Sequence, residues 1–273
     1  LDISHKDKKT IIEKLPRIYR QFMESQLLDI ARDRMEVAPT AHYSMGGVVV
    51  EPGTHKTDVE GLYAAGEVTC GVHGANRLGG NSLAEILVFG RRAGLAAAQY
   101  SAGLGVQVRD QSALQSAHDD LDSFLKTGDE LTRPLQRALR NNMWQNCGVI
   151  RDRARLQKGL ETLDEIRDAS RYVDVRPDAE GYQDLAIALD LRGSLAAAET
   201  TLRSALTRQE SRGAHQRQDY PETSPEFKLN IQIHLDGEKE QVVSTRPVDP
   251  VPTQLQEWLE QQGELSVSGR LLE

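Results

Sequence analysis

Residues 73–86 read HGANRLGGNSLAEI, and this stretch decides most of what the sequence predicts. Small residues surround Arg77, and an apolar helical pattern begins directly after Asn81 and Ser82. Asn and Ser are favoured N-cap residues, so the pair predicts the start of a helix. A helix N-terminus stabilises an anion with its free N–H groups, and Arg77 offers a two-pronged fork for a carboxylate or phosphate. The stretch therefore predicts an anion site, although a glycine-rich turn with a solvated arginine fits these residues equally well.

Two short apolar runs precede this stretch and predict buried strands. Residues 43–51 (YSMGGVVVE) contain a β-branched run, and residues 62–65 (LYAA) end just before a Gly-Glu step. Ligands of open α/β sheets gather at the carboxyl ends of the strands. We therefore expect Glu67 to accept hydrogen bonds from ligand hydroxyl groups, and Gly79 and Gly80 to let a flat ligand approach the backbone.

The rest of the chain reads mostly as helix. One amphipathic pattern covers residues 8–28, with a start or kink at Pro16, and another covers residues 82–100. Pro39 breaks the chain between them. Further helices are predicted over residues 111–127, 133–147, 151–168, 183–211 and 252–262, with a break at 177–181. From Lys228 the apolar period changes to two around an Asp-Gly turn, which predicts a β-hairpin.

Composition restricts the class of protein. The 273 residues are 38% apolar with a net charge of −8, which argues against nucleic acid as a partner because phosphate binding needs clustered Lys and Arg. Cys70 and Cys147 lie far apart and have no metal-ligand spacing, which favours reduced thiols in a cytoplasmic protein. No metal site is expected.

Two further clusters carry candidate residues. His42 lies in a loop before the first predicted strand, where it could donate to a carboxylate, although a lone loop histidine is more often structural. Arg212, His215 and Arg217 crowd around the end of the long predicted helix, with Asp219 close behind. Basic residues at a helix C-terminus complement the helix dipole, so a capping role is favoured there, with Asp219 pairing with one of the arginines.

Five segments taken together resemble a known family. They are, in order, PTAHYSMGGV, GLYAAGEV, HGANRLGGNSLAEILVFGRRAG, MWQNCGVIRD and ESRGAHQRQDYPE. From about residue 1 to 222, the chain resembles the carboxy-terminal part of the flavoprotein subunit of succinate dehydrogenase and fumarate reductase. The related L-aspartate oxidase family has a similar block around the arginine. It ranks second because its glycine pair and its late motif usually differ from those of this chain.

The resemblance implies an α+β fold: the C-terminal part of an FAD-binding α/β domain, then a helical bundle domain and a terminal β-hairpin. Residues 1–35 would form the end of a capping domain and residues 36–105 the part of the FAD-binding domain. Residues 106–222 would form the helical domain, and residues 223–273 the C-terminal hairpin and helix.

The resemblance also implies an activity. It is the FAD-dependent oxidation of succinate to fumarate, or the reverse, with hydride transfer between the dicarboxylate and flavin N5. His42 and Arg77 match residues that hold the substrate carboxylates, while Glu67, Ser82 and Leu83 match contacts to FAD. No catalytic residue is expected in this chain. The proton-shuttle arginine, the GxGxxG fingerprint and the histidine that bears covalent FAD in many members would lie upstream.

The implied partners are the membrane anchor of a respiratory complex and its iron–sulfur subunit, with quinone as the electron acceptor. The protein would then be cytoplasmic, on the inner face of the membrane through its partner subunits. One alternative is L-aspartate oxidase. Another is a non-catalytic C-terminal fragment that serves assembly only.

Overall fold

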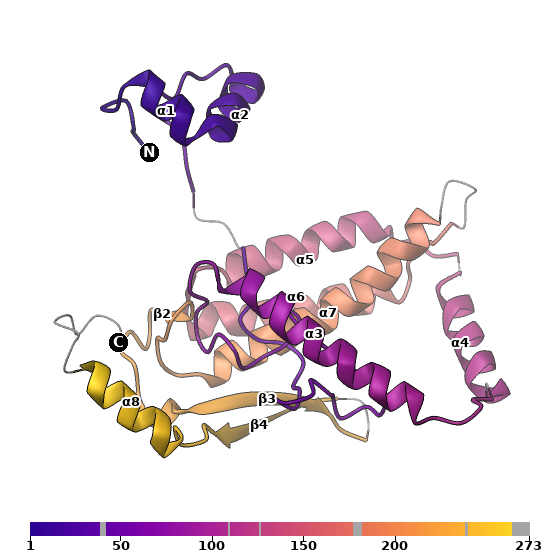
Figure 1. Cartoon of the computed structure of the whole chain (residues 1–273). Coiled ribbons are helices and arrows are strands. Elements are labelled where there is room, and N and C mark those ends of the chain that lie inside the picture. The colour runs from indigo at the N-terminus through magenta and orange to yellow at the C-terminus, as the bar shows by residue number, and fades with distance from the viewer. Residues whose placement is uncertain (39–41, 109, 126, 177–181, 238–239, 264–273) are drawn as a thin grey trace.

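The N-terminal residues form two short helices in a lobe of their own (Figure 1). This computed structural model describes residues 1–38, 42–108, 110–125, 127–176, 182–237 and 240–263. Helix α1 spans Lys8–Lys14 and α2 spans Pro16–Gln26, so the predicted break at Pro16 is confirmed. A small core of Ile11, Ile30 and Met35 stabilises the lobe. The expected breaks at Pro39 and at 177–181, and residues 264–273, lie outside the described residues.

The two strands predicted before the central stretch do not form. Residues 43–51 make one isolated bridge, Val48 to Thr69, and residues 62–65 make another, Lys56 to Tyr63. Val48 and Val49 are exposed, so the apolar run that predicted a buried strand has little to pack against here. Without a neighbouring strand on each side, the β-branched residues do not extend the ladder.

Helix α3, Asn81–Ala102, confirms the helix predicted after the central stretch. Its N-cap differs from the expectation. The cap is Gly80, with φ of 86°, and no side chain caps the first turn. Asn81 and Ser82 are instead the first helical residues, so the predicted Asn-Ser cap was wrong. Glycine adopts this left-handed conformation without steric cost, which lets the chain turn sharply into the helix.

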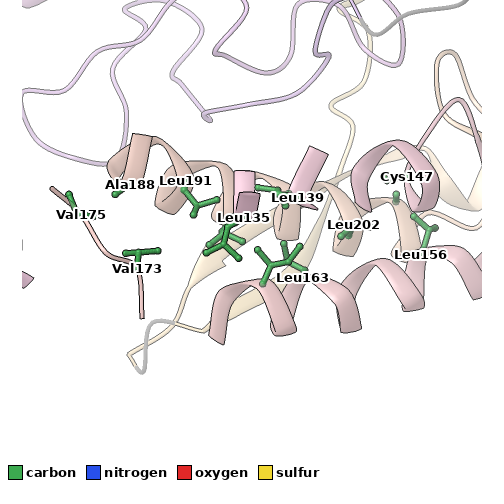
Figure 2. Close-up of a cluster of buried hydrophobic side chains, with 14 residues drawn as sticks. Leu135, Leu139, Cys147, Leu156, Leu163, Val173, Val175, Ala188, Leu191 and Leu202 are labelled. Carbon is green, nitrogen blue, oxygen red and sulfur yellow. The ribbon is translucent and has the colours of Figure 1, made fainter. Parts of the chain in front are cut away.

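Helices α4 (Gln111–Phe124), α5 (Thr132–Asn146), α6 (Arg153–Ser170) and α7 (Gln183–Thr207) follow. Helices α5, α6 and α7 pack into a bundle, while α4 lies to one side of it (Figure 1). Figure 2 shows the core, where leucines from α5, α6 and α7 meet. Leu156, Leu163 and Leu202 are fully buried. At Gly159, a Cβ would lie 2.8 Å from Leu202 Cδ2, so this glycine permits the close approach of α6 and α7.

Short extended segments complete the fold. Strands β1 (Ile150–Arg151) and β2 (Gln216–Arg217) pair in parallel and bring the end of the late motif to the start of α6. A single 3₁₀ turn, η1 (Pro225–Phe227), precedes the predicted hairpin, which is confirmed as antiparallel β3 (Leu229–Leu235) and β4 (Gln241–Pro247).

The hairpin is fastened to the helical bundle. Gln241 on β4 donates from Nε2 to Ala196 O of α7 (3.0 Å) and accepts from Thr200 Oγ1 (3.1 Å). The last predicted helix is α8 (Thr253–Gly263). Within the described part of the chain, no helix has the length and apolar character needed to cross a membrane. Cys70 is half-buried and Cys147 is buried, and both are free thiols.

Candidate functional site

Two segments run side by side and bring candidate residues together. Val48 N–H donates to Val68 O (2.8 Å), and Cys70 N–H donates back to Val48 O (3.1 Å). A Cβ at Gly47 would lie only 2.1 Å from Val68 O, so this close approach requires glycine. Further along, Glu67 Oε1 accepts a hydrogen bond from Ser44 N–H (2.8 Å). Glu67 therefore lies beside the segment that carries His42 and Tyr43.

A cluster of three side chains joins this segment to the central stretch and to α3. Glu85 Oε2 on α3 accepts from the Tyr43 hydroxyl (2.6 Å) and from His73 Nε2 (2.8 Å). The rings of Tyr43 and His73 meet edge to face, with centroids 5.3 Å apart. The side chains of His73 and Glu85 are 7% and 1% exposed, so the cluster is buried beneath the site.

The protonation states in this cluster follow from the contacts. Burial alone would raise the pKa of Glu85, but hydrogen bonds from Tyr43 and His73 outweigh burial and hold the pKa below its ordinary value. The hydrogen bond to Glu85, together with desolvation, raises the pKa of Tyr43 to about 12. An ionised carboxylate only accepts hydrogen bonds. Tyr43 therefore stays protonated and donates a hydrogen bond to Glu85, and His73 carries a proton on Nε2.

Arg77 lies on top of this cluster with unused donors. Its guanidinium carbon is 4.5 Å from the centroid of the Tyr43 ring, a cation–π arrangement. Nη1 donates to Leu78 O at 3.3 Å. Nε is the buried side-chain nitrogen that has no hydrogen-bond partner among the described residues. A buried N–H without an acceptor is costly, so this side chain is prepared for an incoming acceptor such as a carboxylate.

The first turn of α3 lies next to Arg77 in the chain and is open. A Cβ at Gly79 or Gly80 would meet no atom within 4 Å. Ser82 is half-buried, and Leu83 is 66% exposed. Asn81 N–H donates to Leu78 O (3.3 Å), and no side chain caps the first turn, so the next N–H groups, at Ser82 and Leu83, are available to a ligand.

The structure thus joins most of the predicted site residues. Arg77 lies over the Tyr43 ring, and Glu67 is hydrogen-bonded to the next residue, Ser44; the charges of both residues act on the pKa of Tyr43. His42 precedes Tyr43 and has an exposed side chain. Sequence reasoning missed Tyr43, His73 and Glu85. One signal was available, because Glu85 is a charged residue inside the apolar pattern of α3 and such a residue predicts a buried partner.

The late cluster has the capping role that the sequence favoured. Arg217 is 1% exposed, and its Nη1 donates to Ala205 O (2.8 Å) and Arg208 O (3.1 Å) at the end of α7. The predicted pairing of Asp219 is confirmed: two Arg217 nitrogens donate to it at 2.8 and 2.7 Å, and they lower its pKa to about 2. In the part of the chain that is described, no three His, Cys, Asp or Glu side chains gather into a metal site.

Comparison with known proteins places these features in a family. The chain matches the model of the fumarate reductase flavoprotein C-terminal region over residues 136–259, and an FAD binding domain model over residues 1–83. A fumarate reductase (CoM/CoB) protein of Methanothermobacter marburgensis is 39% identical over 235 residues, which cover 86% of this chain and 42% of that protein. L-aspartate oxidase of Acinetobacter baylyi is 35% identical over 237 residues, 85% of this chain and 40% of that protein.

A solved structure agrees with these matches. Mycobacterium smegmatis Sdh1 in complex with UQ1 superposes with a TM-score of 0.86 at 35% identity, over 97% of this chain and 46% of that chain. The chain thus spans less than half the length of the relatives it matches. The α+β fold, with a part of an FAD-binding domain followed by a helical domain, is confirmed. The chain belongs to the flavoprotein family of fumarate reductase and succinate dehydrogenase, whose cofactor is FAD.

Proposed function

We propose that this chain forms one side of the dicarboxylate site of a fumarate reductase or succinate dehydrogenase. In this proposal, Arg77 and His42 hold the two carboxylates of succinate or fumarate. The single observation that carries the proposal is the state of Arg77. Its guanidinium carbon lies over the Tyr43 ring, 4.5 Å from the centroid, and its buried Nε lacks a partner among the described residues. An arginine held this way supports bidentate binding of a carboxylate.

The residues around α3 also fit FAD. Gly79 and Gly80 leave open space beside the backbone, and the first turn of α3 offers free N–H groups at Ser82 and Leu83. Donors at a helix N-terminus stabilise negative charge on a bound ring. Glu67 is exposed and would accept hydrogen bonds from ribityl or ribose hydroxyls. We assign Glu67, Ser82 and Leu83 to cofactor binding.

In this arrangement, the chain acts by orientation. FAD, when bound, supplies the hydride acceptor or donor. Arg77 and His42 fix both ends of the dicarboxylate, so that its central carbons stay in one position, and such fixed geometry is worth several kcal/mol in a reaction of two bound molecules. Glu85 and His73 orient the Tyr43 ring, and the ring supports the Arg77 guanidinium from below. In this proposal, that support keeps the guanidinium in the position from which it binds the substrate carboxylate.

The proposal includes an iron–sulfur subunit, a membrane anchor and quinone as electron partners, because the family resemblance implies them. We also propose that the protein lies on the inner face of the membrane, held there by its partner subunits. The match to L-aspartate oxidase makes L-aspartate the second substrate to test. An enzyme that oxidises L-aspartate faster than succinate would establish that alternative.

The test uses the full-length protein with FAD bound. Arg77→Ala should lower kcat/KM for succinate oxidation and for fumarate reduction about a thousandfold, because the charged partner of one carboxylate is lost. Succinate-dependent dye reduction and fumarate-dependent oxidation of a reduced dye measure the two directions.

Arg92→Ala is the matched control. Arg92 also lies over an aromatic ring, that of Phe89, at 5.5 Å, but it belongs to the middle of α3 rather than to the loop before it. This variant should retain kcat/KM within about twofold, as expected for a surface change. Normal turnover by Arg77→Ala would exclude the proposed role of Arg77.

A further inference from the structure

The loop of the late motif touches the loop that carries Arg77. We call residues 210–217 the Gly213 loop and residues 73–78 the Arg77 loop. Ala214 N–H donates to Ala75 O at 3.0 Å. Gly213 has φ of 58°, and a Cβ there would lie 2.4 Å from Ala75 O and 2.7 Å from Ala75 Cβ. This contact therefore depends on glycine at position 213. The residue that it contacts, Ala75, lies two positions before Arg77 in the chain.

The Gly213 loop is rigid on one side because of a buried carboxylate. Glu210 is fully buried and accepts from Arg208 Nη1 (2.6 Å), Arg212 Nε (2.8 Å) and Ser224 N–H (2.8 Å). Arg212 and His215 also exchange two backbone hydrogen bonds, of 2.8 and 3.0 Å, across the turn that presents Gly213. A fully satisfied buried network fixes its members in one geometry.

His215 fixes the other side. Its Nδ1 lies 3.0 Å from Arg151 Nη1, and its Nε2 lies 3.2 Å from Arg208 O. Arginine only donates and a carbonyl only accepts, so Nδ1 accepts and Nε2 carries the proton. Burial lowers the pKa of His215 to about 4, with Arg151, Arg217 and Arg208 adding to the shift, and the ring is therefore neutral at pH 7. In this tautomer, the ring ties the turn to β1 and to the end of α7.

The Arg77 loop has weaker bonds of its own. Asn76 N–H donates to His73 O at 3.2 Å, and Arg77 Nη1 donates to Leu78 O at 3.3 Å, both within the loop. The His73 side chain anchors the first residue of the loop to Glu85. The hydrogen bond from Ala214 N–H to Ala75 O, at 3.0 Å, is shorter than both and fixes the middle of the Arg77 loop.

We propose that the Gly213 loop is a positioning element for the substrate-binding arginine. Gly213 and Ala214 contact Ala75 and thereby fix the position of the Arg77 loop relative to the helical domain. This inference rests on the proposed function of Arg77. It gives the late motif a task beyond capping α7: the helical domain holds the binding residue of its neighbouring domain in place. Gly213 and Ala214 are positioning residues, since they reach the dicarboxylate only through Arg77.

The experiment compares variants of the full-length, FAD-loaded protein. The probe is malonate, a dicarboxylate that lacks an oxidisable CH₂–CH₂ unit, and its Kd is measured by calorimetry. Gly213→Ala should weaken malonate binding about tenfold, because a displacement of about 1 Å at a binding group has a large cost. FAD content should not change. Hydrogen exchange of the amides in residues 73–78 should become faster, which reports directly on the grip at Ala75.

Gly193→Ala is the matched control, since a Cβ at this position in α7 would meet no atom within 4 Å. It should leave the malonate Kd unchanged. A double-mutant cycle on kcat/KM for succinate gives the decisive comparison. If Gly213 acts through Arg77, Gly213→Ala should lower kcat/KM about tenfold in the wild type and less than about twofold in the Arg77→Ala background.

The outcomes separate the two proposals. If Arg77→Ala leaves malonate affinity unchanged, the proposed function of Arg77 fails and the inference falls with it. If Arg77→Ala weakens binding but Gly213→Ala does not, the function stands and the positioning role is overturned. If Gly213→Ala does not fold, Arg212→Met replaces it, because Arg212 stiffens the same turn through Glu210 without adding a clash. That variant should weaken malonate binding about threefold, and an unchanged Kd overturns the inference.

Discussion

Arg77 lies in the Arg77 loop, and Arg217 ends the Gly213 loop, which contacts it. The two arginines differ in how many of their side-chain donors are hydrogen-bonded within the protein. Arg217 is 1% exposed, and its three guanidinium nitrogens donate to the carboxylate of Asp219 and to carbonyl oxygens at the end of α7. Arg77 has one bond, to Leu78 O, an aromatic ring beneath it and a buried Nε without a partner among the described residues. The first arginine is satisfied by the protein, whereas the second has donors to spare.

This difference separates structural arginines from binding arginines. A guanidinium whose donors are all used lowers the free energy of the folded state and has nothing left for a ligand. A guanidinium that is held by an aromatic ring keeps its N–H donors available to a ligand, in a fixed position. Substitution of the two residues should therefore affect different quantities.

The largest expected effect tests the structural half of this comparison. Arg217→Met in the full-length protein should lower the free energy of unfolding by about 3 kcal/mol, because the carbonyl groups at the end of α7 lose their donor and Asp219 loses its partner. Chemical denaturation measures the change. Arg77→Met, the paired variant, should change the free energy of unfolding by less than about 1 kcal/mol while it removes dicarboxylate binding.

The comparison breaks if the two results are exchanged. A stable Arg217→Met protein would mean that water replaces the lost bonds easily. A strongly destabilised Arg77→Met protein would mean that Arg77 holds the fold rather than a ligand.

The helices and the hairpin could be read from the sequence because their signals are local. The break at Pro16, the presence of helix α3 behind the glycine pair and the Asp-Gly turn each depend on a few neighbouring residues, although the N-cap of α3 was predicted wrongly. Residues 43–51 failed for the opposite reason. Their β-branched run indicates an extended chain, but a strand needs partners distant in sequence, and here the segment has one isolated bridge.

The candidate site was predictable only in part. Arg77 stood out because small residues surround it, and Glu67 because it follows an apolar run. Tyr43 and His73 become a unit only when Glu85, one turn into α3, lies beneath them. That meeting depends on how the loop folds back, and the hydrophobic period does not encode it. The roles of the predicted site residues stay proposals until they are tested.

The second effect concerns pH and the Gly213 loop. His215 has a pKa of about 4 in the folded protein, against about 6.5 when unfolded. Between these values, only the unfolded chain binds the proton, so the free energy of unfolding falls as the pH drops from about 6.5 to about 4. Below that range both states bind the proton, so the loss from this group remains but grows no further. At about pH 5, the loss from His215 is about 2 kcal/mol at most.

His215→Gln should remove this part of the pH dependence. A glutamine amide can still accept from Arg151 and donate to Arg208 O, so the turn keeps its bonds without a titrating group. Denaturation at about pH 7 and about pH 5 gives the measurement. An equal loss in wild type and variant would show that His215 takes up its proton in the folded state as readily as in the unfolded chain.

The smallest effect tests how Arg77 is held. Tyr43→Leu removes the ring under the guanidinium and should weaken malonate binding about fivefold, the range expected for a cation–π contact. Tyr43→Phe keeps the ring but loses the hydroxyl bond to Glu85, and it should weaken binding only about twofold. Calorimetry on both FAD-loaded variants measures the two steps. Full affinity in Tyr43→Leu would mean that the contact of the Gly213 loop with Ala75 is enough to position the arginine. Arg77 would then be held through the backbone of its loop, whereas Arg217 is held through the hydrogen bonds of its own side chain.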